Sequence, residues 1–227
     1  MREKLNKLNN MIEMKNLEGL FEIRNLNELK RFNIRLTLHD QNVSSHSLFV
    51  AIIANYIAHD FEKLEIFDIK NRYRVLISAL THDFEECKLG DILIPSKSNF
   101  KSKYEEESKK IKEELFKKLN IENFDFELNE IEKNIIEFSD KLEGFIYCVE
   151  EVEFGNSQFE EFAKSYYSRL IKIISKFEDK KIRKYLINFL NEIVFQISLK
   201  KNLKNFVKEL EFFEGELNKL NDKLNEI

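Results

Sequence analysis

Apolar residues recur along nearly the whole chain at intervals of three and four, which is the period of an amphipathic helix. Dividing this pattern where it breaks predicts helices at residues 17–37, 44–63, 70–89, 99–120, 127–154, 157–177, 179–198 and 200–226. Only five glycines and one proline interrupt the 227 residues, whereas Leu, Ile, Glu and Lys are abundant. The sequence therefore predicts an all-α fold.

Several of the breaks carry residues that are typical of helix ends. Asn42 and Ser44 precede an apolar stretch, and either side chain can cap its first turn. Asp68 precedes the next stretch in the same way, and Gly90 stands where a helix end favours a left-handed backbone. Residues 91–98 contain the only proline and are expected to form a loop.

The last predicted helix repeats with a period of seven residues. Its apolar positions fall into two such series: Leu203, Leu210, Leu217 and Leu224, and Phe206, Phe213, Leu220 and Ile227. The pattern indicates a final amphipathic helix that packs on its own domain, or a coiled coil between two chains, although Gly215 weakens the second reading. We therefore expect one domain at 17–198 and a C-terminal helical extension at 199–227 that packs or forms a homodimer.

Composition narrows the class of protein. Hydrophobic residues make up 43% of the chain and charged residues 34%, with a net charge of −4 spread along the sequence, which argues against a nucleic-acid binder. Cys87 and Cys148 form neither a disulfide framework nor a metal motif and are expected to be reduced thiols. No signal peptide or membrane-length apolar stretch is found in the sequence. We expect a soluble cytoplasmic protein with no membrane or stable nucleic-acid partner.

One cluster of residues stands out as candidate chemistry. Two of the four histidines precede an aspartate, in His59-Asp60-Phe61-Glu62 and His82-Asp83-Phe84-Glu85. On a helix, His82 and Glu86 would share one face with Asp83 within reach. An imidazole and a carboxylate are two ligands for a divalent cation, and a further carboxylate is left to handle water or protons. The cluster ends in Asp91, just past the predicted helix end.

The other pair, at His59, does not fit the same site. His59 follows His46 by 13 residues, about 220° around a helix, so the two cannot face one ligand. We interpret His59 as a solvated helix end. His46 instead suits a ligand donated to His82 and Asp83 by the preceding helix. Asp140 is a further candidate, because a carboxylate in an apolar helical stretch is costly unless it is paired or metal-bound.

Taken in order, these motifs resemble the HD-domain superfamily, with ligands spaced H…HD…D, and more closely the YfbR-like 5′-deoxynucleotidases. The resemblance covers roughly residues 25–160. The family's Arg-Trp pair and N-V-S-E-H-S motif correspond to Arg31-Phe32 and Asn42-Val43-Ser44-Ser45-His46-Ser47. Its H-D-x-x-E-x-x-x-G-D, P-x-K and D…EE…GN motifs correspond to His82 through Asp91, Pro95 through Lys97, and Asp140 with Glu150-Glu151 and Gly155-Asn156.

The resemblance implies an HD-domain helical bundle with one divalent metal ion, such as Mn²⁺, Co²⁺ or Mg²⁺. It implies His46, His82, Asp83 and Asp140 as the metal ligands. The implied activity is the removal of the 5′-phosphate from (deoxy)nucleoside monophosphates.

The same resemblance implies roles for residues around the metal. Glu86 would activate the attacking water, and Asp91 would assist proton transfer or hold the sugar. Arg31 would clamp the phosphate with its planar fork of donors. Phe32 replaces the family's Trp at the sugar or base wall and lacks the indole N–H, and Lys97 is a further substrate contact.

Two other functions remain open. A dNTP triphosphohydrolase of the same superfamily would need several basic residues at three phosphates, which Lys97, Lys101 and Lys103 can supply. A non-catalytic scaffold would keep the fold and act through the C-terminal helix, but the intact ligand set argues against it. Cys87 stands where (p)ppGpp hydrolases carry Asp, and the single proline excludes the Gly-Tyr-Pro signature of cyclic-dinucleotide phosphodiesterases.

Overall fold

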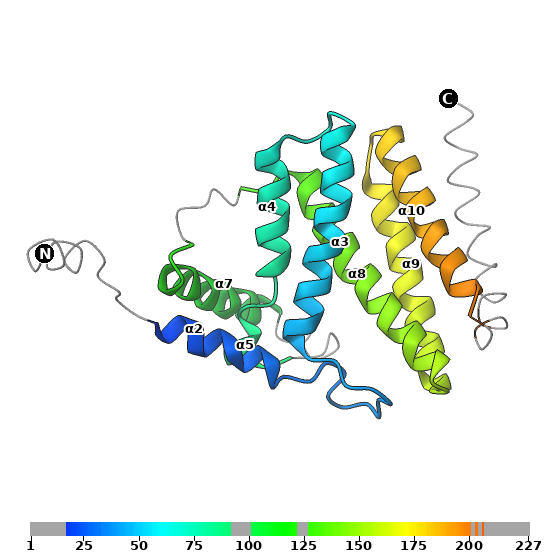
Figure 1. Ribbon diagram of the computed structural model, residues 1–227. Helices are drawn as coiled ribbons and strands as arrows, with labels where there is room; N and C mark the ends of the chain where they lie inside the picture. Colours follow the sequence, from blue (N-terminus) through cyan, green and yellow to red (C-terminus); the bar gives the residue numbers. More distant parts are fainter. Residues whose placement is uncertain (1–16, 92–100, 122–126, 201–202, 204–205, 207–227) are drawn as a thin grey trace, which may run out of the picture.

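The computed structural model describes residues 17–91, 101–121, 127–200, 203 and 206 (Figure 1). Its regular elements are α2 (Glu18–Ile23), η1 (Arg24–Asn27), α3 (Val43–Lys63), α4 (Ile69–Leu80), α5 (Glu86–Leu89), α7 (Lys101–Lys118), α8 (Glu130–Glu153), η2 (Ser157–Phe159), α9 (Glu160–Lys176) and α10 (Lys180–Ser198). Within these residues every element is helical, and the one isolated β-bridge joins Lys30 to Asn42. The predicted all-α fold is confirmed.

The helices form a main bundle and a smaller side cluster. In Figure 1, α3 and α8 lie at the centre of the main bundle, with α4 on one side and α9 and α10 on the other. The main core is filled by large apolar side chains such as Phe61, Phe138 and Phe145. A second apolar cluster, around Leu26 and Leu115, joins η1 and α7 to α5. The candidate site residues His46, His82, Asp83 and Asp140 come from α3, the turn between α4 and α5, and α8.

Side chains at the helix ends explain where several helices begin and stop. The Asn42 side chain accepts a hydrogen bond from the Ser45 backbone N–H at 2.8 Å, as predicted for the start of α3. Asp68 and Asn71 form a reciprocal capping box at the start of α4. Gly90 ends α5 with a φ of +75°, which L side chains rarely adopt.

The predicted helix at 17–37 is wrong beyond Asn27. The chain turns back on itself there, and the Arg31 N–H donates to the Gln41 carbonyl at 2.9 Å. Phe32 has a φ of +56°, which no α-helix accommodates. The exposed apolar residues of this loop alternate with polar ones instead of following the helical period: Ile34, Leu36 and Leu38.

The predicted helix at 70–89 is also interrupted. It ends at Leu80, and the chain becomes helical again only at Glu86. The Thr81 hydroxyl donates to the Ile77 carbonyl at 2.9 Å and so satisfies a carbonyl in the last turn of α4. His82 therefore lies on a turn, and the helical face that it was predicted to share with Glu86 does not exist.

The predicted helices at 44–63, 99–120, 127–154 and 179–198 agree with the structure within about three residues, and 157–177 begins with a short 3₁₀ turn. The predicted helix at 200–226 lies almost wholly outside the described residues. The first two heptad positions, Leu203 and Phe206, are buried in the main core. The later heptad positions lie outside the described residues, as do Lys97 and most of the predicted loop at 91–98. Among the described helices, none is long and apolar enough to cross a lipid bilayer.

Candidate metal centre

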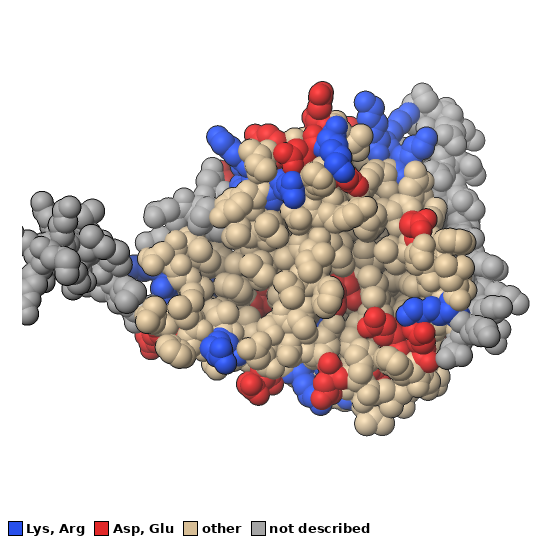
Figure 2. All heavy atoms as spheres, in the orientation of Figure 1, with Lys and Arg blue, Asp and Glu red and all other residues tan. Residues whose placement is uncertain are grey.

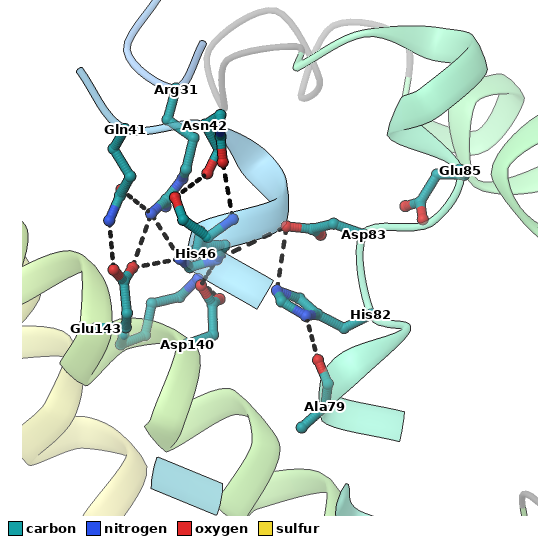
Figure 3. Close-up of polar contacts among 12 residues, drawn as sticks. Arg31, Gln41, Asn42, His46, Ala79, His82, Asp83, Glu85, Asp140 and Glu143 are labelled. Carbon is teal, nitrogen blue, oxygen red and sulfur yellow. Dashed lines mark hydrogen bonds and ion pairs between the residues drawn. The ribbon is translucent and has the colours of Figure 1, made fainter. Parts of the chain in front are cut away.

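Four residues predicted as metal ligands meet at one point (Figure 3). His46 comes from the first turn of α3, His82 and Asp83 from the turn after α4, and Asp140 from α8. His46, His82 and Asp83 each offer a ligand atom, and these three atoms lie within 4.8 Å of one another. Asp140 lies beside this group, with Oδ1 3.3 Å from His46 Nε2. The fold thus brings together side chains that are far apart in the sequence.

Glu143 fixes the orientation of the His46 ring. His46 Nδ1 contacts a carboxylate oxygen of Glu143, and both side chains are buried. Arg31 Nη1 also lies 2.6 Å from this Nδ1. Because the Glu143 carboxylate can only accept, we assign the proton to Nδ1, which directs the Nε2 lone pair towards the other ligands. Sequence reasoning missed Glu143. Its signal was a second carboxylate one turn after Asp140, on the same face of an apolar helix.

His82 is oriented in a similar way by the backbone. Its Nδ1 donates to the Ala79 carbonyl at 2.7 Å, which leaves Nε2 free to act as a ligand. Nε2 is buried and has no hydrogen-bond partner within the described part of the chain, although Asp83 Oδ2 lies 3.1 Å away. A buried nitrogen without a partner is costly, and a metal ion would satisfy it. The residues present therefore fit a divalent cation.

The charges around the cluster also favour a cation. Burial acts to lower the pKa of His82, but the negative charges of Asp83 and Asp140 outweigh it and raise that pKa to about 9. Burial acts to raise the pKa of both carboxyls, yet His82 holds that of Asp83, and His46 with Lys141 that of Asp140, below the usual range. A metal that binds at neutral pH must therefore displace a proton from His82.

Arg31 lies on the Nδ1 side of the His46 ring, next to Gln41 and Glu143 (Figure 3). Its Nη1 donates to Glu143 Oε2 at 2.8 Å and to Gln41 Oε1 at 2.8 Å. Gln41 completes this network by donating to the other Glu143 oxygen at 2.5 Å. Burial acts to lower the pKa of Arg31, but the charge of Glu143 outweighs it and raises that pKa above its ordinary value. The predicted phosphate clamp is thus a charged group held at the edge of the ligand set.

Phe32, the predicted wall of the substrate site, packs in the core. Its ring stacks on Tyr147 at 5.2 Å between centroids and meets Phe159 edge-on at 5.3 Å. Only 9% of the residue is exposed. This packing favours a structural role for Phe32 over contact with a ligand.

The predicted catalytic residues, Glu86 and Asp91, follow the turn at residues 81–85 that carries His82 and Asp83. Glu86 is the first residue of α5 and is buried, and Asp91 lies just past Gly90. The Asp91 carbonyl accepts a hydrogen bond from the Asn33 side chain at 3.0 Å, which joins this segment to the loop that carries Arg31. Sequence reasoning missed Lys141, whose Nζ lies 2.5 Å from Asp140 Oδ2.

Residues from the last motif hold the Arg31 loop in place. Glu151 is fully buried and accepts hydrogen bonds from the backbone N–H of Leu38 at 2.9 Å and of His39 at 3.0 Å. The Asn156 side chain donates to Glu151 at 2.6 Å and to the Leu36 carbonyl at 3.0 Å. Glu151 and Asn156 therefore hold the loop that carries Arg31, and neither of them belongs to the ligand set.

The second His-Asp pair lies at the other end of α3, as predicted. His59 is partly exposed, and its Nδ1 lies 3.0 Å from Arg72 Nη1 and 3.7 Å from Glu62 Oε2. Neither partner belongs to the metal cluster, so the interpretation of His59 as part of a helix end away from the site is confirmed.

Comparisons with known proteins agree with this geometry. A family model described as "5′-deoxynucleotidase YfbR-like" matches residues 20–193. The curated relatives include the 5′-deoxynucleotidase YfbR of Escherichia coli and the 5′-deoxynucleotidase of Citrobacter koseri. Each is 28% identical over 159 residues, which covers 64% of this chain and 78% of the relative.

Solved structures share the fold at lower sequence identity. The HD phosphohydrolase DatZ of cyanophage S-2L, solved with dA and one catalytic Zn²⁺ ion, has a TM-score of 0.59 and 14% identity and covers 86% of this chain and 99% of its own. An HD-domain phosphohydrolase of Listeria innocua has a TM-score of 0.61 and 20% identity, with 85% and 96% covered. These likenesses confirm the predicted HD-type helical fold.

Proposed function

The chain belongs to the YfbR-like 5′-deoxynucleotidase family, and from this premise we propose that it is a metal-dependent phosphohydrolase that removes the 5′-phosphate from (deoxy)nucleoside monophosphates. The observation that carries the proposal is the paired orientation of two histidines. His46 and His82 each commit Nδ1 to an acceptor and direct Nε2 towards Asp83. Such preorganisation is typical of metal-binding histidines.

We propose His46, His82, Asp83 and Asp140 as the ligands of one divalent metal ion. Two imidazoles in the set favour a transition metal such as Mn²⁺, Co²⁺ or Zn²⁺ over Mg²⁺, which prefers oxygen ligands. Bound there, the ion would polarise the phosphoryl oxygens and lower the pKa of a bound water.

The chain's own residues supply the remaining chemistry. Glu86 lies three residues after the ligand Asp83, and we assign it to accept the proton of the attacking water. Asp91 delivers a proton to the departing sugar oxygen or holds the sugar. Arg31 pairs with Glu143 and Lys141 pairs with Asp140, and we assign both cations to stabilise negative charge on the phosphoryl group. Arg31 keeps its direction because Glu143 anchors it.

A screen of nucleotides tests the proposal directly. Nucleoside mono- and triphosphates are incubated with the protein and Mn²⁺, Co²⁺, Zn²⁺ or Mg²⁺, and the released products are identified. We expect inorganic phosphate from 5′-deoxynucleoside monophosphates. Release of triphosphate from dNTPs would instead establish the triphosphohydrolase alternative. Metal binding without hydrolysis of any nucleotide would favour the scaffold.

A cytoplasmic location is also part of the proposal. Cys87 and Cys148 are both buried free thiols. Burial raises the pKa of Cys87 to about 11, so this thiol stays protonated and unreactive at neutral pH. Unpaired cysteines of this kind are typical of a reducing compartment.

We further propose that the protein is a homodimer and that the α3–α4 face forms the contact. Seven large apolar side chains on the outside of these two helices are 37–62% exposed and define this face: Leu48, Phe49, Ile52, Tyr56, Ile69, Tyr73 and Leu80. Figure 2 shows a broad area over α3 and α4 that is largely uncharged, between charged margins. Exposed apolar patches of this size are uncommon on monomers.

The size and shape of the α3–α4 face suit a second copy of the chain. A half-exposed aromatic or large aliphatic side chain buries about 100 Å² when covered, so the seven approach the roughly 800 Å² per partner of a standard interface. An uncharged face can meet itself across a two-fold axis without repulsion between like charges. Two antiparallel helices from each copy then form a four-helix arrangement.

Replacing Ile52 with Lys is expected to convert the dimer into monomers, because it places two charges in the buried centre of the contact. Light scattering coupled to size-exclusion chromatography measures the mass. The matched control is Phe195→Lys, at a similarly exposed apolar residue on α10. A monomeric wild type, or dissociation by Phe195→Lys alone, would contradict an interface at the α3–α4 face.

A further inference from the structure

We propose that Lys112 and Glu85 are positioning residues that hold the ligand turn in its metal-binding shape. The inference rests on the proposed function, because it concerns how His82 and Asp83 are aimed. Neither residue belongs to the ligand set. Lys112 lies outside every motif of the family resemblance, and Glu85 fills an unspecified position of the H-D-x-x-E motif.

The turn that carries His82 and Asp83, residues 81–85, needs support from side chains elsewhere in the chain. It follows the end of α4, so its backbone lacks the repeated hydrogen bonds of a helix. Across from it, Lys112 of α7 donates from Nζ to the His82 carbonyl oxygen. The same Nζ lies 2.9 Å from Glu85 Oε2. One ammonium group therefore contacts the turn at two points, the His82 carbonyl and the Glu85 carboxylate.

The His82 carbonyl that accepts from Lys112 belongs to the peptide bond between the two ligands His82 and Asp83. A peptide unit is planar, so fixing its oxygen fixes the direction in which the chain leaves His82 and enters Asp83. A rotation of this peptide would displace both ligand side chains at once. Hydrogen bonds from a charged donor are roughly twice as strong as neutral ones, which suits Lys112 to this role.

Glu85 in turn fixes Lys112. Its side chain is only 7% exposed. Ser108, one turn before Lys112 on α7, donates from Oγ to Glu85 Oε1 at 3.1 Å. A buried carboxylate requires a partner, so the pair cannot separate without cost. The neighbouring Lys110 differs: it is 57% exposed and pairs with Glu106 and Glu107 of its own helix.

Titration with Mn²⁺ in a calorimeter tests the positioning role independently of activity. Lys112→Met is expected to weaken Mn²⁺ binding about 10–100-fold, the usual effect of losing an outer partner of a metal ligand. Lys112→Arg should restore part of the affinity, because the charge and donors remain. Lys110→Met should leave the affinity unchanged.

A second variant separates positioning from stability. In Glu85→Gln/Lys112→Met no uncompensated charge is buried, so the melting temperature should recover relative to Lys112→Met while Mn²⁺ binding stays weak. Mn²⁺ affinity within about twofold of the wild type in both variants, set against the 10–100-fold expected, would overturn the inference. Failure of the wild type to bind stoichiometric Mn²⁺, Co²⁺ or Zn²⁺ would instead overturn the proposed function, and the positioning role with it.

Discussion

Replacing Glu86 with Gln is expected to lower kcat about 10²–10⁴-fold, the range that a positioned general base contributes. The amide keeps the size of the buried side chain and one acceptor oxygen, replaces the other oxygen with an NH₂ donor, and cannot accept a proton at neutral pH. Because Glu86 is not among the ligands, Mn²⁺ affinity should stay close to that of the wild type. Phosphate release under saturating substrate and metal measures the effect.

The second His-Asp motif offers a control carboxylate. Lys63 stands at the position that corresponds to Glu86, so the control is the preceding residue, Glu62, which lies at the far end of α3 from the metal ligands. Glu62→Gln should leave kcat unchanged. Undiminished hydrolysis by Glu86→Gln would mean that another group accepts the proton of the attacking water.

Replacing His82 with Ala is expected to abolish both stoichiometric metal binding and hydrolysis. The change removes a ligand itself, so the loss of affinity should exceed the 10–100-fold that an outer partner costs. Metal binding to the wild type should release the proton that His82 carries, whereas any weak binding that remains in the variant should release none from this position. Calorimetry in two buffers of different ionisation enthalpy measures affinity and proton release together.

His59→Ala serves as the counterpart in this experiment. It should bind metal and hydrolyse substrate like the wild type, because its partners are Arg72 and Glu62. Equal metal binding by His82→Ala and the wild type would refute the assigned ligand set. A wild type that hydrolyses nucleotides after removal of all metal would refute metal dependence.

Helical periodicity predicted most of the fold because local signals agree with tertiary packing over long stretches. The caps at Asn42 and Asp68 were found for the same reason, since each bonds a backbone N–H three residues away. The loop at 28–42 was missed because its partners are distant in sequence. Glu151 holds the Leu38 and His39 backbone from 113 and 112 residues away, and no local pattern encodes that contact.

The candidate site was predicted in part for the wrong reason. Sequence pattern chose His82-Asp83 over His59-Asp60, and the structure brings the chosen pair to His46. The argument from a shared helical face failed, because Thr81 ends α4 one residue before the ligands. Glu143 carried a readable signal in its spacing from Asp140. Lys112 carried none, because α7 is rich in charged residues that look alike in sequence.

The spread of the ligands along the chain links the metal to folding itself. They come from α3, from the turn after α4 and from the middle of α8, so no single helix or hairpin assembles the site before the bundle has closed. On the proposed function, an ion that binds only the closed bundle stabilises it by about 2.7 kcal/mol at a free concentration of 100 times Kd. Depletion of the metal would then shorten the lifetime of the protein as well as abolish hydrolysis, because the metal-free bundle unfolds more often and is then cleaved by proteases.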